Sequence, residues 1–168
     1  MKSSAQDFAA AAERHLEDVH AYLVYLTGDR TVAEDLTAET FARALERWRR
    51  YDPRRGSPRT WLCQLARTTT LDHFRAEERR RRRERRYAVA ELREHEEPVF
   101  GEGLSPGLQR ALSRLSAAER EVVALRVVLE LDGEGAARVL GISQTACSTR
   151  LSRALEKLEK EVSAGVAA

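Results

Sequence analysis

The sequence has few of the residues that interrupt helices or hold together small disulfide-rich folds. Its 168 residues include only four prolines, nine glycines and two cysteines. Apolar and polar residues do not alternate over any sustained run, so no β-strand is predicted. No apolar stretch approaches the length of a transmembrane helix, and the start MKSSAQDF lacks the apolar core of a signal peptide. These absences favour an all-α fold without membrane insertion.

The patterns that most enzyme and metal sites require are also missing. The four histidines are scattered, and no second metal ligand stands at a suitable spacing except in accidental pairs. There is no glycine-rich phosphate loop, and neither cysteine has a recognisable partner base. We therefore predict no enzymatic activity, no catalytic residue, no metal and no cofactor. Cys63 and Cys147 fall on apolar helix faces, so we expect buried free thiols, in agreement with a reducing cytoplasm.

The charges are strongly segregated along the chain although the net charge is only +2. Residues 1–42 have a net charge of −5, whereas residues 43–86 contain sixteen arginines and have a net charge of +10. Residues 87–109 are acidic again, with a net charge of −4, and residues 110–168 are nearly neutral at +1. Positive charge concentrated in one segment points to a polyanionic partner.

Three helices are predicted for an N-terminal domain over residues 1–86. The apolar periodicity of the first extends over about residues 7–27. The second opens with a capping box at residues 31–34 and continues to about Arg50. The third begins with Ser57 as N-cap, followed by a proline at the first helical position, and is expected to dissolve into the arginine run before Arg86.

Residues 87–104 are predicted to be an acidic, flexible linker because they combine glutamates with Pro98, Gly101 and Gly103 and have no useful periodicity. Three interpretations stay open. The linker is a disordered spacer, or it fits a positively charged nucleic-acid channel of a partner, or it folds back on Arg79–Arg86 in the free protein and masks DNA binding. A second helical domain is predicted over residues 105–162, followed by a frayed tail at residues 163–168.

Residues 133–158 have the pattern of a helix-turn-helix. Gly141 supplies the left-handed position that ends the first helix, and Ser143 is the N-cap of the second. Gly135 is expected to loosen the packing of the first helix. The second helix has an apolar face and a polar face able to contact base edges or phosphates. The polar candidates are Gln144, Thr145, Ser148, Thr149, Arg150 and Arg153. An ordinary helical hairpin is the alternative.

The order of these motifs resembles the extracytoplasmic-function (ECF) sigma factors of the sigma-70 family. AEDLTAETFARA (33–44) is similar to the family's segment that docks on core RNA polymerase. SPRTWLCQLARTTTLDHFR (57–75) is similar to the segment that melts the promoter and recognises its minus-ten element. Residues 115–158 are similar to the segment that recognises the minus-thirty-five element. The resemblance implies two small helical domains, with core RNA polymerase and promoter DNA as partners and an anti-sigma protein as a candidate partner.

The resemblance also implies roles for particular residues. The polymerase-docking set is Asp35, Leu36, Glu39 and Arg43. The minus-ten and melting set is Tyr51, Arg55, Arg59, Trp61, Arg67, Thr68, Asp72 and Arg75. Within it, Tyr51 is the candidate for trapping an unstacked base, whereas Trp48 and Trp61 fit a core position better. The arginine run from Arg79 to Arg83 is expected to neutralise phosphates.

The sequence departs from the family's pattern at several positions. Thr68 stands where the family commonly has asparagine, Ala38 where it often has glutamine, and Ser148 where it often has lysine. Thr68 is expected to change the minus-ten preference, and Ser148 to remove a possible phosphate contact. The alternatives to a sigma factor are a stand-alone helix-turn-helix repressor or activator and an adaptor that binds only protein. The terminal pair Ala167-Ala168 resembles endings that unfoldase-proteases recognise, which makes such a protease a further candidate partner.

Overall fold

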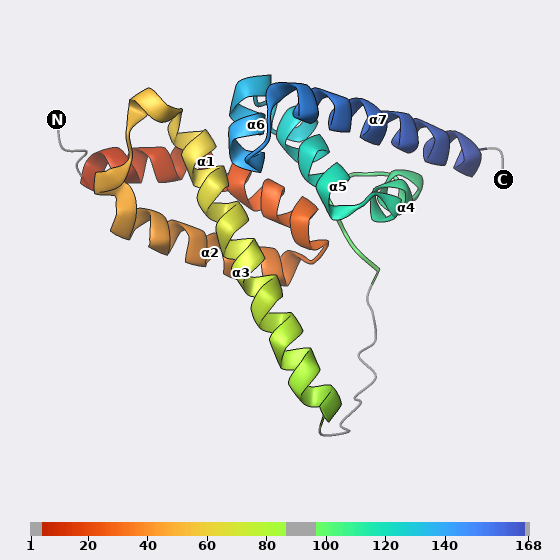
Figure 1. Ribbon diagram of the computed structural model, residues 1–168, viewed down its shortest axis with the longest axis horizontal. Helices are drawn as coiled ribbons and strands as arrows, with labels where there is room; N and C mark the ends of the chain where they lie inside the picture. The colour runs from red at the N-terminus through yellow and green to blue at the C-terminus, as the bar shows by residue number, and fades with distance from the viewer. Residues whose placement is uncertain (1–4, 87–96, 167–168) are drawn as a thin grey trace.

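The computed structural model describes residues 5–86 and 97–166, and within these ranges the chain is all-α, as the sequence predicts. Helices and short 3-10 turns are the only regular elements of the described residues, and Figure 1 shows their arrangement. The elements are α1 (Ala5–Thr27), α2 (Arg30–Arg47), η1 (Trp48–Arg50), η2 (Pro53–Arg55), α3 (Pro58–Arg86), α4 (Pro106–Arg114), α5 (Ala117–Val123), η3 (Ala124–Val128, a π-helical turn), α6 (Gly133–Leu140) and α7 (Gln144–Val166).

Helices α1, α2 and α3 pack together around one apolar core. Tyr22 and Leu23 from α1, Leu36 from α2, and Leu62 and Cys63 from α3 are buried there. Together with Val19 of α1 and Ala66 of α3, they form one buried face of each helix, and burial of these faces stabilises the bundle. Burial raises the pKa of the Cys63 thiol to about 12. Cys147 is buried as well, which confirms the prediction of buried free thiols.

Helix α2 begins two residues earlier than its sequence suggests. Gly28 adopts a left-handed conformation with φ of 66°, and Asp29 follows in an extended conformation. The Asp29 carboxylate then accepts a hydrogen bond from the Val32 N–H at 3.1 Å. The predicted capping box at residues 31–34 is therefore wrong, because the aspartate after the glycine already caps the helix. The regular helix also ends at Arg47, before the short turn η1.

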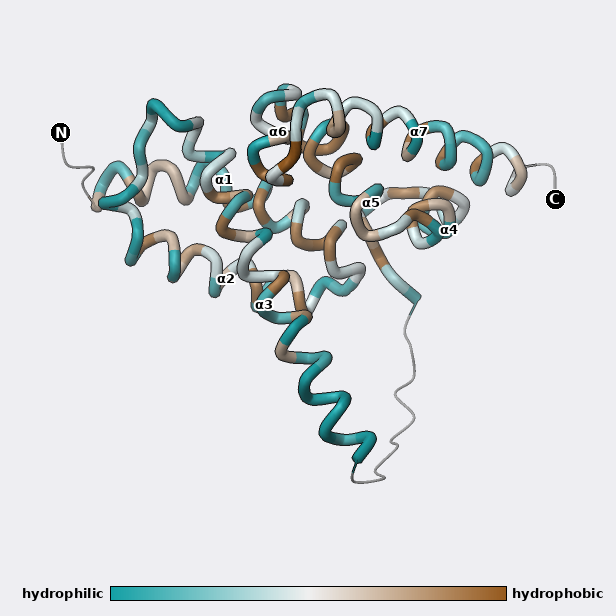
Figure 2. The backbone as a smooth tube through the Cα atoms, viewed as in Figure 1, coloured by the Kyte–Doolittle hydropathy of each residue, from teal (hydrophilic) through white to brown (hydrophobic). Residues whose placement is uncertain are grey.

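The arginine run is helical and does not dissolve, contrary to the sequence prediction. Helix α3 continues to Arg86, and its second half projects away from the rest of the chain as a hydrophilic rod (Figures 1 and 2). Arg80 lies 3.0 Å from Glu77 and 3.6 Å from Glu84, and Arg82 lies 3.0 Å from Glu78. Glutamates three or four residues from arginines offset the repulsion on the helix surface, and arginine itself favours helix.

Helices α4 and α5 start where the sequence predicts. Ser105 caps α4, and Ser116 with Glu119 forms the expected capping box at the start of α5. The helix beyond α5 widens into the π-helical turn η3, and Asp132 then caps α6. The Arg126 guanidinium donates a hydrogen bond to the Leu131 carbonyl across this turn. The two helix reversals that follow bring α7 against α5, and α6 against α7 and α3.

Helices α6 and α7 form the predicted helix-turn-helix. Gly141 is left-handed with φ of 66°, and the Ser143 hydroxyl accepts a hydrogen bond from the Ala146 N–H at 3.1 Å. Gly135 does not loosen α6, since a Cβ atom at this position would lie 2.9 Å from Asp132 Oδ1 and 3.3 Å from Thr60 Oγ1. The glycine permits close packing. The expected frayed tail is also partly wrong, because α7 continues to Val166; Ala167 and Ala168 lie outside the described residues.

Part of the predicted linker is packed against both domains. Phe100 is only 2 % exposed and lies beside Tyr25, with the Arg120 guanidinium 5.2 Å above its ring. The Val99 N–H donates to the Gly28 carbonyl at 2.9 Å, and the Gln109 amide bonds the backbone of residues 100 and 101. Residues 97–104 are thus a strap between the domains, while the predictions for residues 87–96 lie outside the described part of the chain.

Replacing Glu119 tests the electrostatics of the α5 capping box. The backbone N–H of Ser116 donates to the Glu119 carboxylate and, with the Lys157 ammonium, holds its pKa below the ordinary value. A lowered pKa in the folded state contributes stability above the unfolded pKa, and this stability is lost as pH falls through the folded pKa. Glu119→Gln should therefore lower the free energy of unfolding by about 0.5–1 kcal/mol at neutral pH.

This deficit should shrink as the pH falls below the ordinary glutamate value of 4.5. Urea unfolding at neutral and acidic pH measures it, with Glu156→Gln on the exposed face of α7 as the matched control. If the loss of unfolding free energy in Glu119→Gln were the same at both pH values, the result would contradict a charged Glu119 cap.

Candidate nucleic-acid and polymerase interfaces

The start of α7 presents a polar, exposed surface. Gln144, Thr145, Ser148 and Thr149 are all exposed, and Cys147 on the opposite face is 1 % exposed. A groove of about 580 Å³ lies where the start of α7 faces the capped start of α5. Thr145, Thr149, Arg150 and Arg153 line this groove. Hydroxyls and guanidinium groups beside a helix N-terminus suit a phosphate backbone, while the exposed first turn suits base edges.

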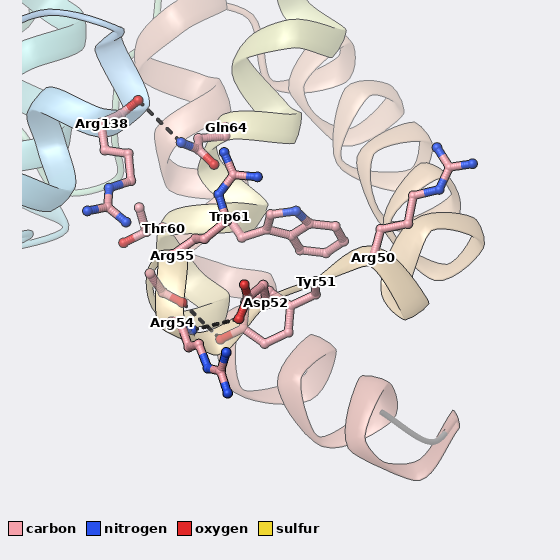
Figure 3. A pocket seen from close by; sticks show the side chains of 10 residues that line it. Arg50, Tyr51, Asp52, Arg54, Arg55, Thr60, Trp61, Gln64 and Arg138 are labelled. Atoms are coloured by element: carbon pink, nitrogen blue, oxygen red, sulfur yellow. Dashed lines mark hydrogen bonds between the residues drawn. The ribbon is translucent and has the colours of Figure 1, made fainter. Parts of the chain in front are cut away.

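A second polar surface surrounds the loop between α2 and α3. A pocket of about 570 Å³ is lined by Tyr51, Trp61 and several arginines (Figure 3). Those arginines are Arg50, Arg54 and Arg55 of the loop and Arg138 of α6. The pocket thus brings positive charge and aromatic rings together, a combination suited to single-stranded nucleic acid.

Tyr51 is not the freely exposed aromatic that its loop position suggests. Its ring stacks on Trp48 with centroids 4.9 Å apart, and its hydroxyl donates to the Gly56 carbonyl at 3.0 Å. Trp61 joins the same cluster, 5.7 Å from Trp48 and 5.6 Å from Tyr51. Trp48 is buried, as expected, whereas Trp61 is half-buried and reaches the pocket. Tyr51 is therefore already packed against both Trp48 and Trp61 and is only partly exposed.

Several arginines of the predicted minus-ten set are already paired with carboxylates. Arg59 lies 3.5 Å from Asp18 of α1, and the Arg67 Nε donates to Glu121 of α5 at 2.7 Å. Arg75 is exposed but lies 3.7 Å from Asp72, whereas Thr68 is exposed on α3 without a carboxylate partner among the described residues. Arg55 is exposed at the rim of the pocket. The predicted set therefore divides into an open part and a part held by interactions within the chain.

The predicted docking residues occupy the exposed face of α2, with one exception. Asp35 and Glu39 are exposed, and Arg43 donates to Glu39 at 2.5 Å and to Asp72 of α3 at 3.1 Å. The bond to Asp72 is the main cause that raises the pKa of Arg43. Leu36 is only 2 % exposed. It points into the core of the bundle, so the prediction that it contacts polymerase is wrong.

Sequence reasoning missed the contacts between the two domains. Glu121 is buried and accepts hydrogen bonds from both Tyr22 and Arg67, and the Gln64 amide donates to the Arg138 carbonyl at 3.3 Å. Burial, followed by the adjacent Glu121 charge, raises the pKa of Tyr22 well above its ordinary value. The available signal was a glutamate directly before Val122 and Val123, on the apolar side of a helix.

Two family models match the chain in the order of its domains. "Sigma-70 region 2" matches residues 11–80 and "Sigma-70, region 4" matches residues 107–158, which together cover more than half of the chain. The ECF RNA polymerase sigma factor SigC of Mycobacterium tuberculosis is 32 % identical over 142 residues, covering 84 % of this chain and 76 % of SigC. The chain belongs to the ECF sigma factors.

Other similar proteins agree with this family. The ECF sigma factor BldN of Streptomyces coelicolor is 31 % identical over 159 residues, which cover 93 % of this chain but only 60 % of BldN. A solved sigma factor, RpoE of Bartonella quintana in complex with the anti-sigma factor NepR, has the same fold. The TM-score is 0.73 at 24 % identity, covering 94 % of this chain and 98 % of the solved chain.

The described residues add two observations on other functions. None of the described helices is long and apolar enough to cross a membrane. No three histidine, cysteine, aspartate or glutamate side chains gather as a potential metal site within the described ranges.

Proposed function

We propose that this ECF sigma factor binds core RNA polymerase and directs it to particular promoters. The α2 face around Asp35 and Glu39 would dock on polymerase. The loop and α3 surface of residues 51–75 would hold the melted minus-ten strand, and the first turns of α7 would recognise the minus-thirty-five element in duplex DNA. The chain would supply binding and orientation, with the chemistry of RNA synthesis left to polymerase, and it would act in the cytoplasm.

The observation that carries this proposal is the exposed start of α7. Four side chains able to hydrogen-bond bases are exposed on the second helix of a helix-turn-helix whose opposite face is buried. Such a helix enters the major groove with its N-terminal residues against base edges. The N-terminal domain then distinguishes a sigma factor from a stand-alone repressor, because a repressor has no need of an acidic docking face beside an arginine-lined pocket.

Co-purification tests the proposal directly. Purified chain is mixed with bacterial core RNA polymerase, and the complex is separated by size exclusion. We expect a stoichiometric complex that binds promoter DNA more tightly than the free chain. If the chain forms no complex with core polymerase and binds duplex DNA equally tightly without it, the stand-alone helix-turn-helix protein would be favoured. An anti-sigma protein is the second protein partner that we propose, on the precedent of the solved RpoE complex.

A further inference from the structure

Glu121 is a buried carboxylate at the contact between the two domains. Its residue is 6 % exposed, and its Oε1 atom accepts hydrogen bonds from the Tyr22 hydroxyl and from Arg67 Nε, each at 2.7 Å. Glu121 comes from α5, whereas Tyr22 and Arg67 come from α1 and α3. A buried charge is costly unless it is paired and hydrogen-bonded, so this carboxylate stabilises only the arrangement in which the domains touch.

The same domain contact covers the inner face of α3. Helix α6 lies on it, where Gln64 donates to the Arg138 carbonyl and Gly135 closely approaches Thr60. Figure 3 shows the Arg138 side chain beside Thr60, with the Arg138 carbonyl bonded to Gln64. Helix α6 and Glu121 therefore cover the side of α3 that carries Gln64 and Arg67, whereas Trp61 still faces the open pocket.

We propose that Glu121 takes the place of a DNA phosphate on Arg67 and thereby holds the free sigma factor in a closed, autoinhibited conformation. A carboxylate and a phosphate oxygen compete for the same guanidinium, so each excludes the other. When DNA replaces Glu121 on Arg67, the released carboxylate is hydrated and the domains separate. The proposal rests on the proposed function only in treating Arg67 as a DNA contact.

The strap of residues 97–104 suits this device. Phe100 is buried between Tyr25 of the N-terminal domain and Arg120 of the C-terminal domain, next to Glu121 in the sequence. Arg30 of α2 also pairs with Glu102 at 2.6 Å. These strap contacts form when the two domains touch, so they break together with the Glu121 hydrogen bonds when the domains separate. These contacts are apolar or exposed, so Glu121 is the element that DNA can replace by charge.

Glu121→Gln tests the proposal because it keeps the size of the side chain and removes its charge. Small-angle scattering of the full chain measures the radius of gyration, and fluorescence anisotropy measures binding to a labelled pool of random single-stranded DNA. We expect Glu121→Gln to enlarge the radius and to raise DNA affinity by about fivefold or more. Glu156→Gln, the same change at an exposed position of α7 outside the groove, should alter neither quantity.

A double-mutant cycle with Arg67→Ala separates competition from simple packing. In the Arg67→Ala background, Glu121→Gln should give no further gain in DNA affinity, because the contested guanidinium is gone. Tyr22→Phe, which removes one hydrogen bond and leaves the ion pair, should give a smaller opening. It also serves as the test variant if Glu121→Gln does not fold by circular dichroism.

Two results would overturn the proposal. A Glu121→Gln chain as compact as the unmodified chain, with the same DNA affinity, would show that Glu121 does not hold the closed state. An expanded chain without tighter DNA binding would make Glu121 a structural tie only. Either result could occur while the unmodified chain still forms a complex with core polymerase, so the proposed function is judged separately by that complex.

Discussion

Reversing two charges on α2 should abolish most polymerase binding without unfolding the chain. In Asp35→Arg with Glu39→Arg, both altered side chains are exposed, and the only pair lost is the Glu39–Arg43 bridge within one helix. Such exposed pairs contribute about 0.3–0.5 kcal/mol, so the melting temperature should change little. Like charges placed across an interface are far more costly, and we expect co-purification with core polymerase to fall by about tenfold or more.

The matched control is Glu13→Arg with Glu17→Arg. These residues have the same spacing and exposure on α1 and give the same change of charge. The control should retain polymerase binding. Full retention by the folded α2 double variant would rule out this face as the docking surface, and equal loss by both variants would reduce the effect to net charge.

Substitutions in α7 should separate sequence recognition from phosphate binding. Gln144 is exposed in the first turn, where a docked recognition helix reaches base edges, and Arg153 lies two turns further along at the groove beside α5. Gln144→Ala should change which minus-thirty-five sequences are preferred and cost about 1–3 kcal/mol on the best one. Arg153→Ala should weaken all sequences nearly equally and reduce the salt slope by about one unit.

Selection from a randomised duplex pool at several salt concentrations measures both effects in the full chain. Ser163→Ala, near the end of α7, is a control that should change neither preference nor salt slope. A uniform loss for Gln144→Ala together with altered preferences for Arg153→Ala would reverse the assignment. If neither variant has an effect, α7 does not recognise DNA and the adaptor interpretation gains weight.

Helix positions and several caps could be predicted from the sequence because they depend on neighbouring residues. Ser105, Ser116 and Gly141 lie at helix ends where local hydrogen bonds or backbone conformation decide the outcome. The α2 cap was missed because two candidates, Asp29 and Thr31, stand two residues apart. The left-handed Gly28 places Asp29 in the extended conformation that a cap requires.

Which side chains of the site are already paired depends on contacts between residues far apart in the sequence. No local sequence pattern contains such contacts. The pairing of Arg67 with Glu121 joins residues 54 positions apart, and Tyr22 is 99 positions from the same glutamate. Sequence reasoning selected Arg67 for its charge and position in a motif, but it could not show that another domain already occupies this side chain. Leu36 was wrongly predicted to contact polymerase because it lies within the docking motif. Such a motif also contains residues that hold its helix to the core, and Leu36 is one of them.

Transcription by purified core polymerase tests directly whether this chain directs initiation at particular promoters. Core polymerase is incubated with nucleotides and a library of promoter fragments, with and without this chain, and the transcripts are sequenced at their starts. We expect new transcripts from a defined subset of promoters only when the chain is present, and their loss with Asp35→Arg and Glu39→Arg. Duplex binding by the chain with no new start site under any condition would contradict this expectation.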